Sequence, residues 1–188
     1  MKTQYYTATS VDGYIADPDN SLEWLFQFGG EAEDQAMNDY YPRFIAQVGA
    51  TAMGSTTYEW ILAHENLVQE PEKWPYEMPC WVFSTRDLPS IEGADIRFVE
   101  GDVAPVHAEM VEAAGGKNVW IVGGGELVGQ FHDAGLLDEL ILFLAPVTLG
   151  AGAPLLPRRI VNPPLELQSV ESLGGVFAVL RYEVRKSG

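Results

Sequence analysis

Short apolar runs that alternate with helical segments constrain the fold of this chain more than any other feature. Residues 119–122 and 140–147 are apolar throughout, which is typical of strands buried on both faces of a sheet. Between residues 34 and 48, apolar side chains recur at the spacing of an amphipathic helix. Parallel strands need crossover connections, and alternating helices supply them. The sequence therefore predicts an α/β fold with a mostly parallel central sheet.

The remaining strands complete this sheet. Aromatic, β-branched and apolar segments predict four further strands, at 2–9, 50–53, 81–84 and 96–99. Near the C-terminal end, segments 165–172 and 176–184 flank Gly174-Gly175, with no room for a crossover helix between them. They are therefore predicted to form an antiparallel hairpin at the sheet edge.

Two helix starts are marked by capping residues. Thr56 and Glu59 match a capping box, in which a hydroxyl and a carboxylate satisfy free backbone amides, so a helix is predicted from about Thr57. Asp102 precedes an apolar helical pattern and is predicted to cap it, with Pro105 tolerated in the first turn.

Composition favours one acidic domain. A chain of 188 residues that is 47% hydrophobic suits a single domain, residues 1–188, better than two small ones. The formal charge of −16 repels nucleic-acid phosphates and anionic membrane surfaces, so neither is expected as a partner. The apolar runs are too short to span a bilayer, and residues 1–4 lead into a strand without the apolar run of a signal peptide. A cytoplasmic location is therefore expected.

The cysteine and histidine residues predict neither a disulfide nor a metal site. Cys80 is the one cysteine of the chain, and its apolar surroundings indicate a buried, unreactive thiol. The three histidines, His64, His107 and His132, lie far apart without the paired spacing of metal ligands. We expect them on the surface or at helix ends.

Two predicted strand-to-helix junctions have the character of anion sites. Residues 53–57 and 122–126 both place small residues at a helix start. The free amides and the positive end of the helix dipole favour a phosphate there, and glycine lets it approach the backbone. One such cluster is commonly only a turn, but two in one parallel sheet indicate a ligand at its carboxyl edge.

Motifs at four places resemble the dihydrofolate reductase superfamily in order and spacing. They are Ser10-Val11-Asp12-Gly13-Tyr14-Ile15-Ala16, Met53-Gly54-Ser55-Thr56-Thr57-Tyr58-Glu59, Ser84-Thr85-Arg86 and Val122-Gly123-Gly124-Gly125. More narrowly, Ser10-x-Asp12-Gly13 and the later Leu149-Gly150-x-Gly152-x-Pro154-Leu155-Leu156 are similar to the reductase domain of bifunctional riboflavin-biosynthesis deaminase/reductases and their stand-alone relatives. The likeness covers nearly the whole chain and implies a dihydrofolate reductase-like three-layer sandwich.

The resemblance also implies that NADPH binds in an extended pose across the sheet edge. In sequence order, the implied cofactor-binding residues are Ala8, Thr9 and Ile15 at the nicotinamide, Gly54, Ser55, Thr56 and Thr57 at the phosphates, Ser84, Thr85 and Arg86 at the adenosine end, and Gly123, Gly124, Gly125, Glu126 and Leu127 at the pyrophosphate and nicotinamide side. In the family the paired glycines are joined by a cis peptide bond, which we expect between Gly123 and Gly124. The family often has Arg where this chain has Ser55, so Arg86 alone is predicted to favour NADPH over NADH.

Catalytic and substrate-binding residues are less clearly marked. A reductase needs a proton donor besides the hydride, and the candidates are Asp34 and Asp39, on the predicted helix, and Glu23. For each, a solvated surface carboxylate is the alternative. Trp24 and Arg43 are candidates for contact with the substrate, and Arg158 and Arg159 are further arginines available for a substrate phosphate, although a solvated ion pair suits all three.

Three hypotheses for function follow. The first is an NADPH-dependent reductase acting on a pyrimidine or pterin-like ring, resembling 5-amino-6-(5-phosphoribosylamino)uracil reductase. The second is a dihydrofolate reductase, and the third is a nucleotide-binding module without catalysis, which the fold alone does not exclude. A homodimer is also predicted, because the edge hairpin and the apolar strand at 140–145 could pair across a two-fold axis.

Overall fold

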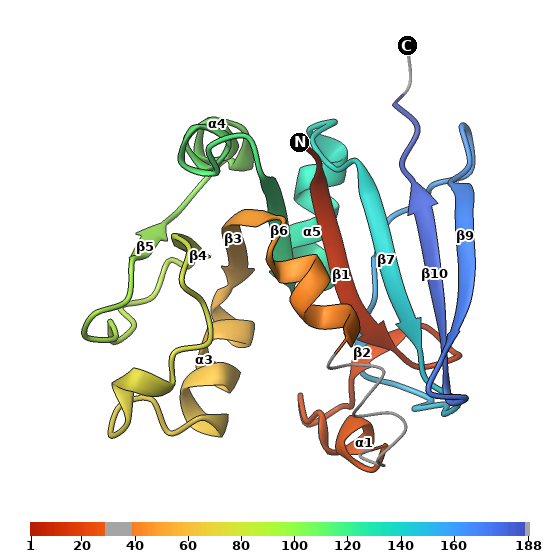
Figure 1. The fold of residues 1–188 in the computed structure, drawn as a ribbon, viewed down its shortest axis with the longest axis horizontal. Coiled ribbons are helices and arrows are strands. Elements are labelled where there is room, and N and C mark those ends of the chain that lie inside the picture. Colours follow the sequence, from red (N-terminus) through yellow and green to blue (C-terminus); the bar gives the residue numbers. More distant parts are fainter. Residues whose placement is uncertain (29–38, 187–188) are drawn as a thin grey trace.

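The computed structural model describes residues 1–28 and 39–186. They contain an eight-stranded sheet with the strand order β5-β4-β3-β6-β1-β7-β10-β9 (Figure 1). Its strands are β1 (Thr3–Thr9), β3 (Val48–Gly54), β4 (Cys80–Phe83), β5 (Ile96–Val99), β6 (Asn118–Gly123), β7 (Glu139–Leu144), β9 (Glu166–Leu173) and β10 (Phe177–Glu183). A separate two-stranded sheet pairs β2 (Tyr14–Ala16) with β8 (Ala153–Pro154).

The direction of the strands confirms the predicted α/β class. The strands from β5 to β7 in this order pair parallel to one another. The last two differ, because β10 pairs antiparallel with both β7 and β9. The C-terminal hairpin is therefore present at the sheet edge, as predicted.

Helices cover both faces of the sheet and give three layers. The described helices are α1 (Glu23–Phe26), a helical segment over residues 39–45, α3 (Ser55–His64), the 3₁₀ turn η1 (Pro71–Lys73), α4 (Val103–Ala113) and α5 (Gly125–Asp133). Side chains of a strand alternate between faces, so Tyr5 packs with α4 and α5, whereas Tyr6 stacks on Phe44 of the opposite helical segment at 4.2 Å between ring centroids. The α3 side chains Tyr58 and Ile61 bury a third cluster on that same opposite side.

Two boundaries and one pairing differ from the predictions. Val48 was expected to end the helix but begins β3, where it is 2% exposed and pairs with Asn118, because a turn at residues 46–47 intervenes. The strand predicted at 140–147 ends at Leu144. It also lies between β1 and β10, whose hydrogen bonds occupy both of its edges. The prediction that residues 140–145 pair with a second copy is therefore wrong, and β9 is the strand left at that edge.

The two predicted caps have different outcomes. Asp102 caps α4 as predicted, since its carboxylate accepts a hydrogen bond from the Ala104 amide at 3.0 Å. The capping box is wrong: α3 begins at Ser55 with Gly54 as its N-cap, and no side chain caps it. The Glu59 carboxylate instead accepts hydrogen bonds from both terminal nitrogens of Arg86, at 2.9 and 2.7 Å. A tertiary ion pair has thus replaced the local hydrogen bond.

Within the described residues, neither the cysteine nor the side chains of the types that bind metals form a further site. Cys80 is buried in β4, and burial raises the pKa of its thiol to about 12, so the thiol is unreactive at neutral pH. Within residues 1–28 and 39–186, no three His, Cys, Asp or Glu side chains are grouped as metal ligands would be. The same described residues include no helix with the length and hydropathy of a membrane span.

Candidate functional site

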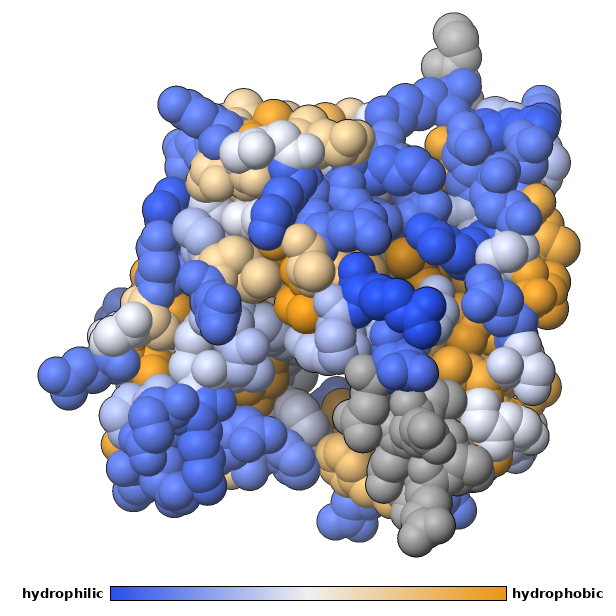
Figure 2. All heavy atoms as spheres, in the orientation of Figure 1, coloured by the Kyte–Doolittle hydropathy of each residue, from blue (hydrophilic) through white to orange (hydrophobic). Residues whose placement is uncertain are grey.

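A cavity of about 790 Å³ opens at the carboxyl ends of the parallel strands, the edge at which open α/β sheets bind ligands. Figure 2 shows the surface hollowed there, between the parts formed by α3 and α1. Predicted cofactor residues make up about half of the lining: Ile15, Gly54, Ser55, Thr56, Thr57, Ser84, Thr85, Gly123, Gly124, Gly125, Glu126 and Leu127. The fold therefore brings together residues that are separated by more than 100 positions in the sequence.

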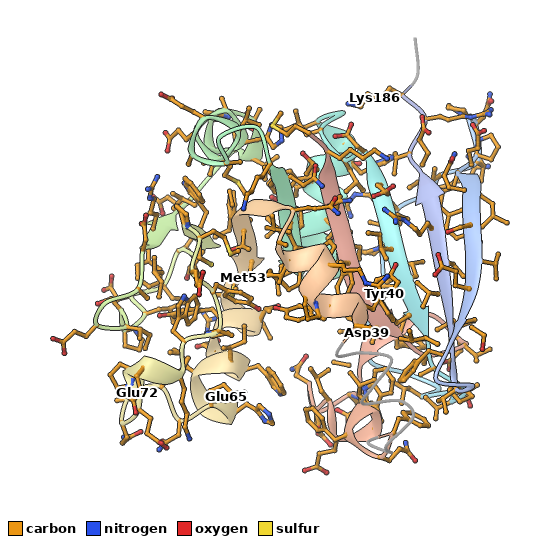
Figure 3. The ribbon with its side chains drawn as sticks, viewed as in Figure 1. Asp39, Tyr40, Met53, Glu65, Glu72 and Lys186 are labelled. Atoms are coloured by element: carbon orange, nitrogen blue, oxygen red, sulfur yellow. The ribbon has the colours of Figure 1, made fainter. Side chains whose placement is uncertain are left out.

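The two glycine-containing bends face one another in this cavity. Met53, labelled in Figure 3, pairs with Gly123 in the sheet, so the ends of β3 and β6 lie side by side. A Cβ atom on Gly54 would lie 3.9 Å from the Gly123 oxygen and 4.0 Å from the Gly124 nitrogen. The peptide bond between Gly123 and Gly124 is cis, as expected. The bends thus form one floor of glycine backbone, bordered by the side chains of Thr57 and Ile15.

Helices α3 and α5 both begin at this floor. Their N-caps are Gly54 and Gly124, and neither helix start is capped by a side chain. The first amides of each helix therefore remain free for a ligand, and the positive ends of both helix dipoles point toward it. Two such starts beside one another suit a diphosphate, which has anionic oxygens on both phosphorus atoms.

A second wall of the cavity is held in place by Asp12. Its carboxylate accepts hydrogen bonds from the Ser10 hydroxyl at 2.6 Å and from the backbone amides of Leu149 and Gly150 at 3.0 and 2.7 Å. The Ser10 hydrogen bond has the largest effect and lowers the pKa of Asp12; desolvation opposes it, and the two amides add to the lowering. These bonds join the turn before β2 to the loop before β8, and both strands line the cavity.

Close backbone contacts fix this wall against α5. A Cβ atom on Gly125 would lie 2.3 Å from the Pro154 oxygen, and one on Gly152 would lie 2.0 Å from the Ala16 oxygen. Both distances are far below van der Waals contact, so only glycine allows these segments to pack. Sequence reasoning quoted both glycines as parts of motifs but assigned them no packing role.

Three predicted cofactor residues lie outside the cavity lining. Ala8 faces the opposite cluster around Tyr6. Thr9 is 1% exposed, and its hydroxyl donates to the Tyr14 oxygen at 3.2 Å. Thr7 lines the cavity from this strand. Arg86, the third, directly follows the lining residue Thr85 and is bound to Glu59 as described above.

Of the candidate catalytic and substrate residues, those that the structure describes are not brought to the lining. Asp34 lies outside the described residues. Asp39, labelled in Figure 3, is exposed, and its backbone oxygen accepts a hydrogen bond from the Arg43 Nε atom at 2.8 Å. Glu23 is exposed on α1, and Trp24 packs against the cluster around Tyr6 and Phe44. Arg43 is itself exposed and lies outside the lining.

The charged residues among the described lining residues are both acidic, Glu100 and Glu126. Arg158 donates to Glu126 at 2.8 and 2.9 Å and to Asp133 at 2.7 Å, and its hydrogen bond lowers the pKa of Glu126. Glu126 therefore remains ionised at neutral pH, and the Arg158 guanidinium is already engaged by two carboxylates. Glu100 follows β5 and forms no ion pair with the described part of the chain.

Sequence reasoning missed several lining residues, among them Trp60, Glu100, Asn20 and Leu22. Two of them had a usable signal. Trp60 is four positions after Thr56, so the two share one face of α3. Glu100 directly follows a strand of the parallel sheet, where ligand-contacting residues gather. Asn20 and Leu22 lie in a loop whose course no local pattern predicts.

Comparisons with known proteins agree with this geometry. The sequence matches the model of the RibD C-terminal domain family over residues 2–179. It is 33% identical to the uncharacterized protein YwjB of Bacillus subtilis (strain 168) over 174 residues, 92% of each chain. A candidate riboflavin biosynthesis protein from Shewanella sp. PV-4 superimposes with a TM-score of 0.79 at 25% identity, covering 98% of this chain and 100% of the other. The deaminase/5-amino-6-(5-phosphoribosylamino)uracil reductase of Thermotoga maritima superimposes with a TM-score of 0.65 at 14% identity, covering 97% of this chain and 56% of that one.

Proposed function

This chain belongs to the RibD C-terminal domain family, and we propose that it is an NADPH-dependent reductase acting on a pyrimidine or pterin-like ring. The observation that carries the proposal is the pair of uncapped helix starts that share one glycine floor in one cavity. The cavity volume of about 790 Å³ falls within the range of small-molecule and cofactor sites.

The backbone amides at the starts of α3 and α5 would hold the phosphates of the dinucleotide. Gly54 and Gly124 present no side chain there, so the phosphates can approach the amides within hydrogen-bonding distance. Ser55, Thr56 and Thr57 add hydroxyl donors beside the same amides. Ser84 and Thr85, at the end of β4, would contact the adenosine end.

The nicotinamide would lie over the other end of the floor, between Thr7 and Ile15. The Ile15 Cδ1 atom lies 3.9 Å from the Cβ position of Gly124, so an apolar side chain stands directly above the glycines. When bound, the dinucleotide supplies the hydride. Ile15, backed by the Asp12 hydrogen bonds to the loop at Leu149–Gly150, would exclude water from that face of the ring.

The substrate ring would occupy the side of the cavity lined by Asn20, Leu22 and Trp60. An amide side chain matches the alternating donors and acceptors of a pyrimidine edge, and an indole offers a surface for stacking. Glu126 is held ionised by Arg158, so it is a poor proton donor. We therefore propose that the proton comes from a water molecule at the cavity mouth.

The substrate proposal draws on the Thermotoga maritima structure, which is named as a 5-amino-6-(5-phosphoribosylamino)uracil reductase. Dihydrofolate is a weaker candidate, because Asp39, which is the described one of the two candidate helix carboxylates, is exposed and away from the lining. The decisive experiment mixes purified protein and NADPH with either that uracil or dihydrofolate and follows NADPH oxidation. Oxidation with the uracil supports the proposal, and oxidation with dihydrofolate alone contradicts the substrate assignment. Binding of NADPH without turnover on any ring substrate would identify a nucleotide-binding module instead.

A further inference from the structure

The adenosine end of the cavity carries an unusual set of charges for a site that takes NADPH. Ser84 and Thr85 line it, and Arg86 follows directly. Glu100 lines it from the neighbouring strand end, held close by the hydrogen bond from the Ser84 amide to the Val99 oxygen at 2.9 Å. No Lys or Arg belongs to the lining among the described residues. A 2′-phosphate at this end therefore depends on Arg86.

Arg86 is already engaged by a carboxylate. Its two terminal nitrogens donate to the two oxygens of Glu59, at 2.9 and 2.7 Å. This is the parallel two-bond geometry that a guanidinium also uses for phosphate. The Arg86 amide donates to the Ser84 hydroxyl at 2.9 Å, which fixes the backbone of the loop beside the lining.

Glu59 stands on the cavity side of α3. It is not itself part of the lining, but it follows Ser55 by four positions and Thr56 by three, and both of these residues line the cavity. Residues three and four apart share a helix face, so the carboxylate lies at the rim, where Arg86 and a bound ribose would meet. The same carboxylate would repel a phosphate group at this position.

Resting on the proposed function, we infer that Glu59 is a specificity-determining residue that competes with the 2′-phosphate of NADPH for Arg86. The side chains of Arg86 and Glu59 are 52% and 40% exposed, and exposed pairs of this kind are weak. A phosphate with about two negative charges can therefore displace the single charge of Glu59. NADH has a hydroxyl at this position, and this group does not need Arg86. It would donate a hydrogen bond to the Glu100 carboxylate.

The test is a set of binding titrations on the full chain with NADPH and with NADH, followed by tryptophan fluorescence. The variants are Glu59→Gln, Arg86→Gln and the double variant. Glu65→Gln is the matched control, because Glu65 lies at the other end of α3 (Figure 3) and contacts His64 at 3.9 Å, away from Arg86. All these side chains are exposed or half-exposed, and far-ultraviolet circular dichroism verifies that each variant folds.

Glu59→Gln is expected to tighten NADPH binding about three- to tenfold, from the lost competition and the lost repulsion, and to leave NADH within about twofold. Glu65→Gln should change neither the affinity for NADPH nor the affinity for NADH. Most of the gain should be lost in the Arg86→Gln background, where only the lost repulsion remains, and the gain should shrink at about 0.5 M salt. Adenosine 2′,5′-bisphosphate should reproduce the NADPH pattern as a competitor, because it carries the adenosine end alone.

The outcomes separate the two proposals. An NADPH-to-NADH affinity ratio that is the same in wild type and Glu59→Gln overturns the inference and leaves the reductase proposal standing. A gain of the same size without Arg86 also overturns it, because repulsion alone would then be the cause. Wild-type protein that binds neither dinucleotide overturns both the proposed function and the inference.

Discussion

The carboxylate of Asp12 accepts a hydrogen bond from the backbone amide of Gly150 at 2.7 Å, across 138 residues of sequence. The adjacent amide of Leu149 donates to the same carboxylate at 3.0 Å. Neither partner belongs to the helices that form the cavity floor. The contact matters because it places Ile15 and Pro154, which line the cavity from two distant segments.

Asp12→Asn is therefore expected to lower the Tm and to weaken dinucleotide binding. Because its folded-state pKa is lowered, Asp12 contributes stability above its unfolded pKa of about 3.9, and this contribution is lost as the pH falls through the folded pKa. The Tm difference between wild type and Asp12→Asn should thus be largest near neutral pH and should shrink below about pH 4. Differential scanning calorimetry across this range measures it.

Asp19→Asn is the control for this prediction, since Asp19 is an exposed carboxylate in the neighbouring loop and its side chain accepts no hydrogen bond within the described residues. It should have the Tm of wild type at each pH. A Tm difference for Asp12→Asn that stays constant with pH would show that the charge of Asp12 does not strengthen its hydrogen bonds to the Leu149 and Gly150 amides.

Two glycine substitutions should separate stability from binding. Gly125→Ala puts a Cβ 2.3 Å from the Pro154 oxygen, and the backbone must shift, so we expect a loss of about 1–3 kcal/mol in the free energy of unfolding. Gly54→Ala meets only contacts of 3.9 and 4.0 Å and should unfold like wild type. It should nevertheless weaken NADPH binding roughly tenfold, because the methyl group occupies the phosphate floor. Urea unfolding and fluorescence titration of the same two proteins test this, and equal stability loss in both would contradict it.

Glu139 anchors the opposite end of the sheet, and its removal should cost stability without affecting the cavity. The side chain is 3% exposed and accepts hydrogen bonds from Lys2 at 2.9 Å and Arg181 at 3.1 Å, as well as from Gln4. Burial raises its pKa, but these hydrogen bonds and the Arg181 charge outweigh burial, so the pKa is lowered. Glu139→Ala should lose about 1–3 kcal/mol, because it removes the acceptor of the buried Gln4 amide. Lys2 and Arg181, 49% and 36% exposed, contribute less because water solvates them once they are unpaired.

The exposed Glu183→Ala is the matched control for Glu139→Ala, and we expect it to change the free energy of unfolding by less than about 0.5 kcal/mol. Urea unfolding compares the two variants with wild type. Dinucleotide affinity should be unchanged in both, because pocket residues lie at the other end of the strands. A Glu139→Ala protein as stable as wild type would show that desolvation cancels the ion pairs.

The prediction of a homodimer now rests on β9, the strand at the sheet edge. Leu167 and Val170 in this strand are 52% and 59% exposed, and Figure 2 shows hydrophobic residues along this side of the molecule. β9 also carries Glu, Gln and Ser side chains, but an exposed edge strand with apolar side chains such as these two can pair with a second copy. We expect a dimeric mass by light scattering at micromolar concentration and a monomeric mass for Val170→Glu. A monomeric wild type would contradict the prediction.

Much of the fold was encoded locally. The apolar runs that became β6 and β7, the turn at Gly174-Gly175 and the cap at Asp102 each follow from the preferences of a few adjacent residues. The glycine clusters at Gly54 and Gly123–Gly125 were also recognisable, because glycine after a buried strand is a local signal. A parallel sheet places both bends at its carboxyl edge, but that β3 and β6 are neighbours there is a property of the strand order.

Tertiary structure decided which side chains serve the cavity and which serve packing. The spacing of Thr56 and Glu59 is compatible with a cap, but Arg86, which is 27 positions from Glu59, offers that carboxylate an ion pair instead. Thr9 and Thr7 have the same periodicity in β1, yet the loop after the strand buries one and leaves the other in the lining. Local patterns set which conformations a segment can adopt, whereas the partner of a polar group depends on which distant segment the fold places beside it.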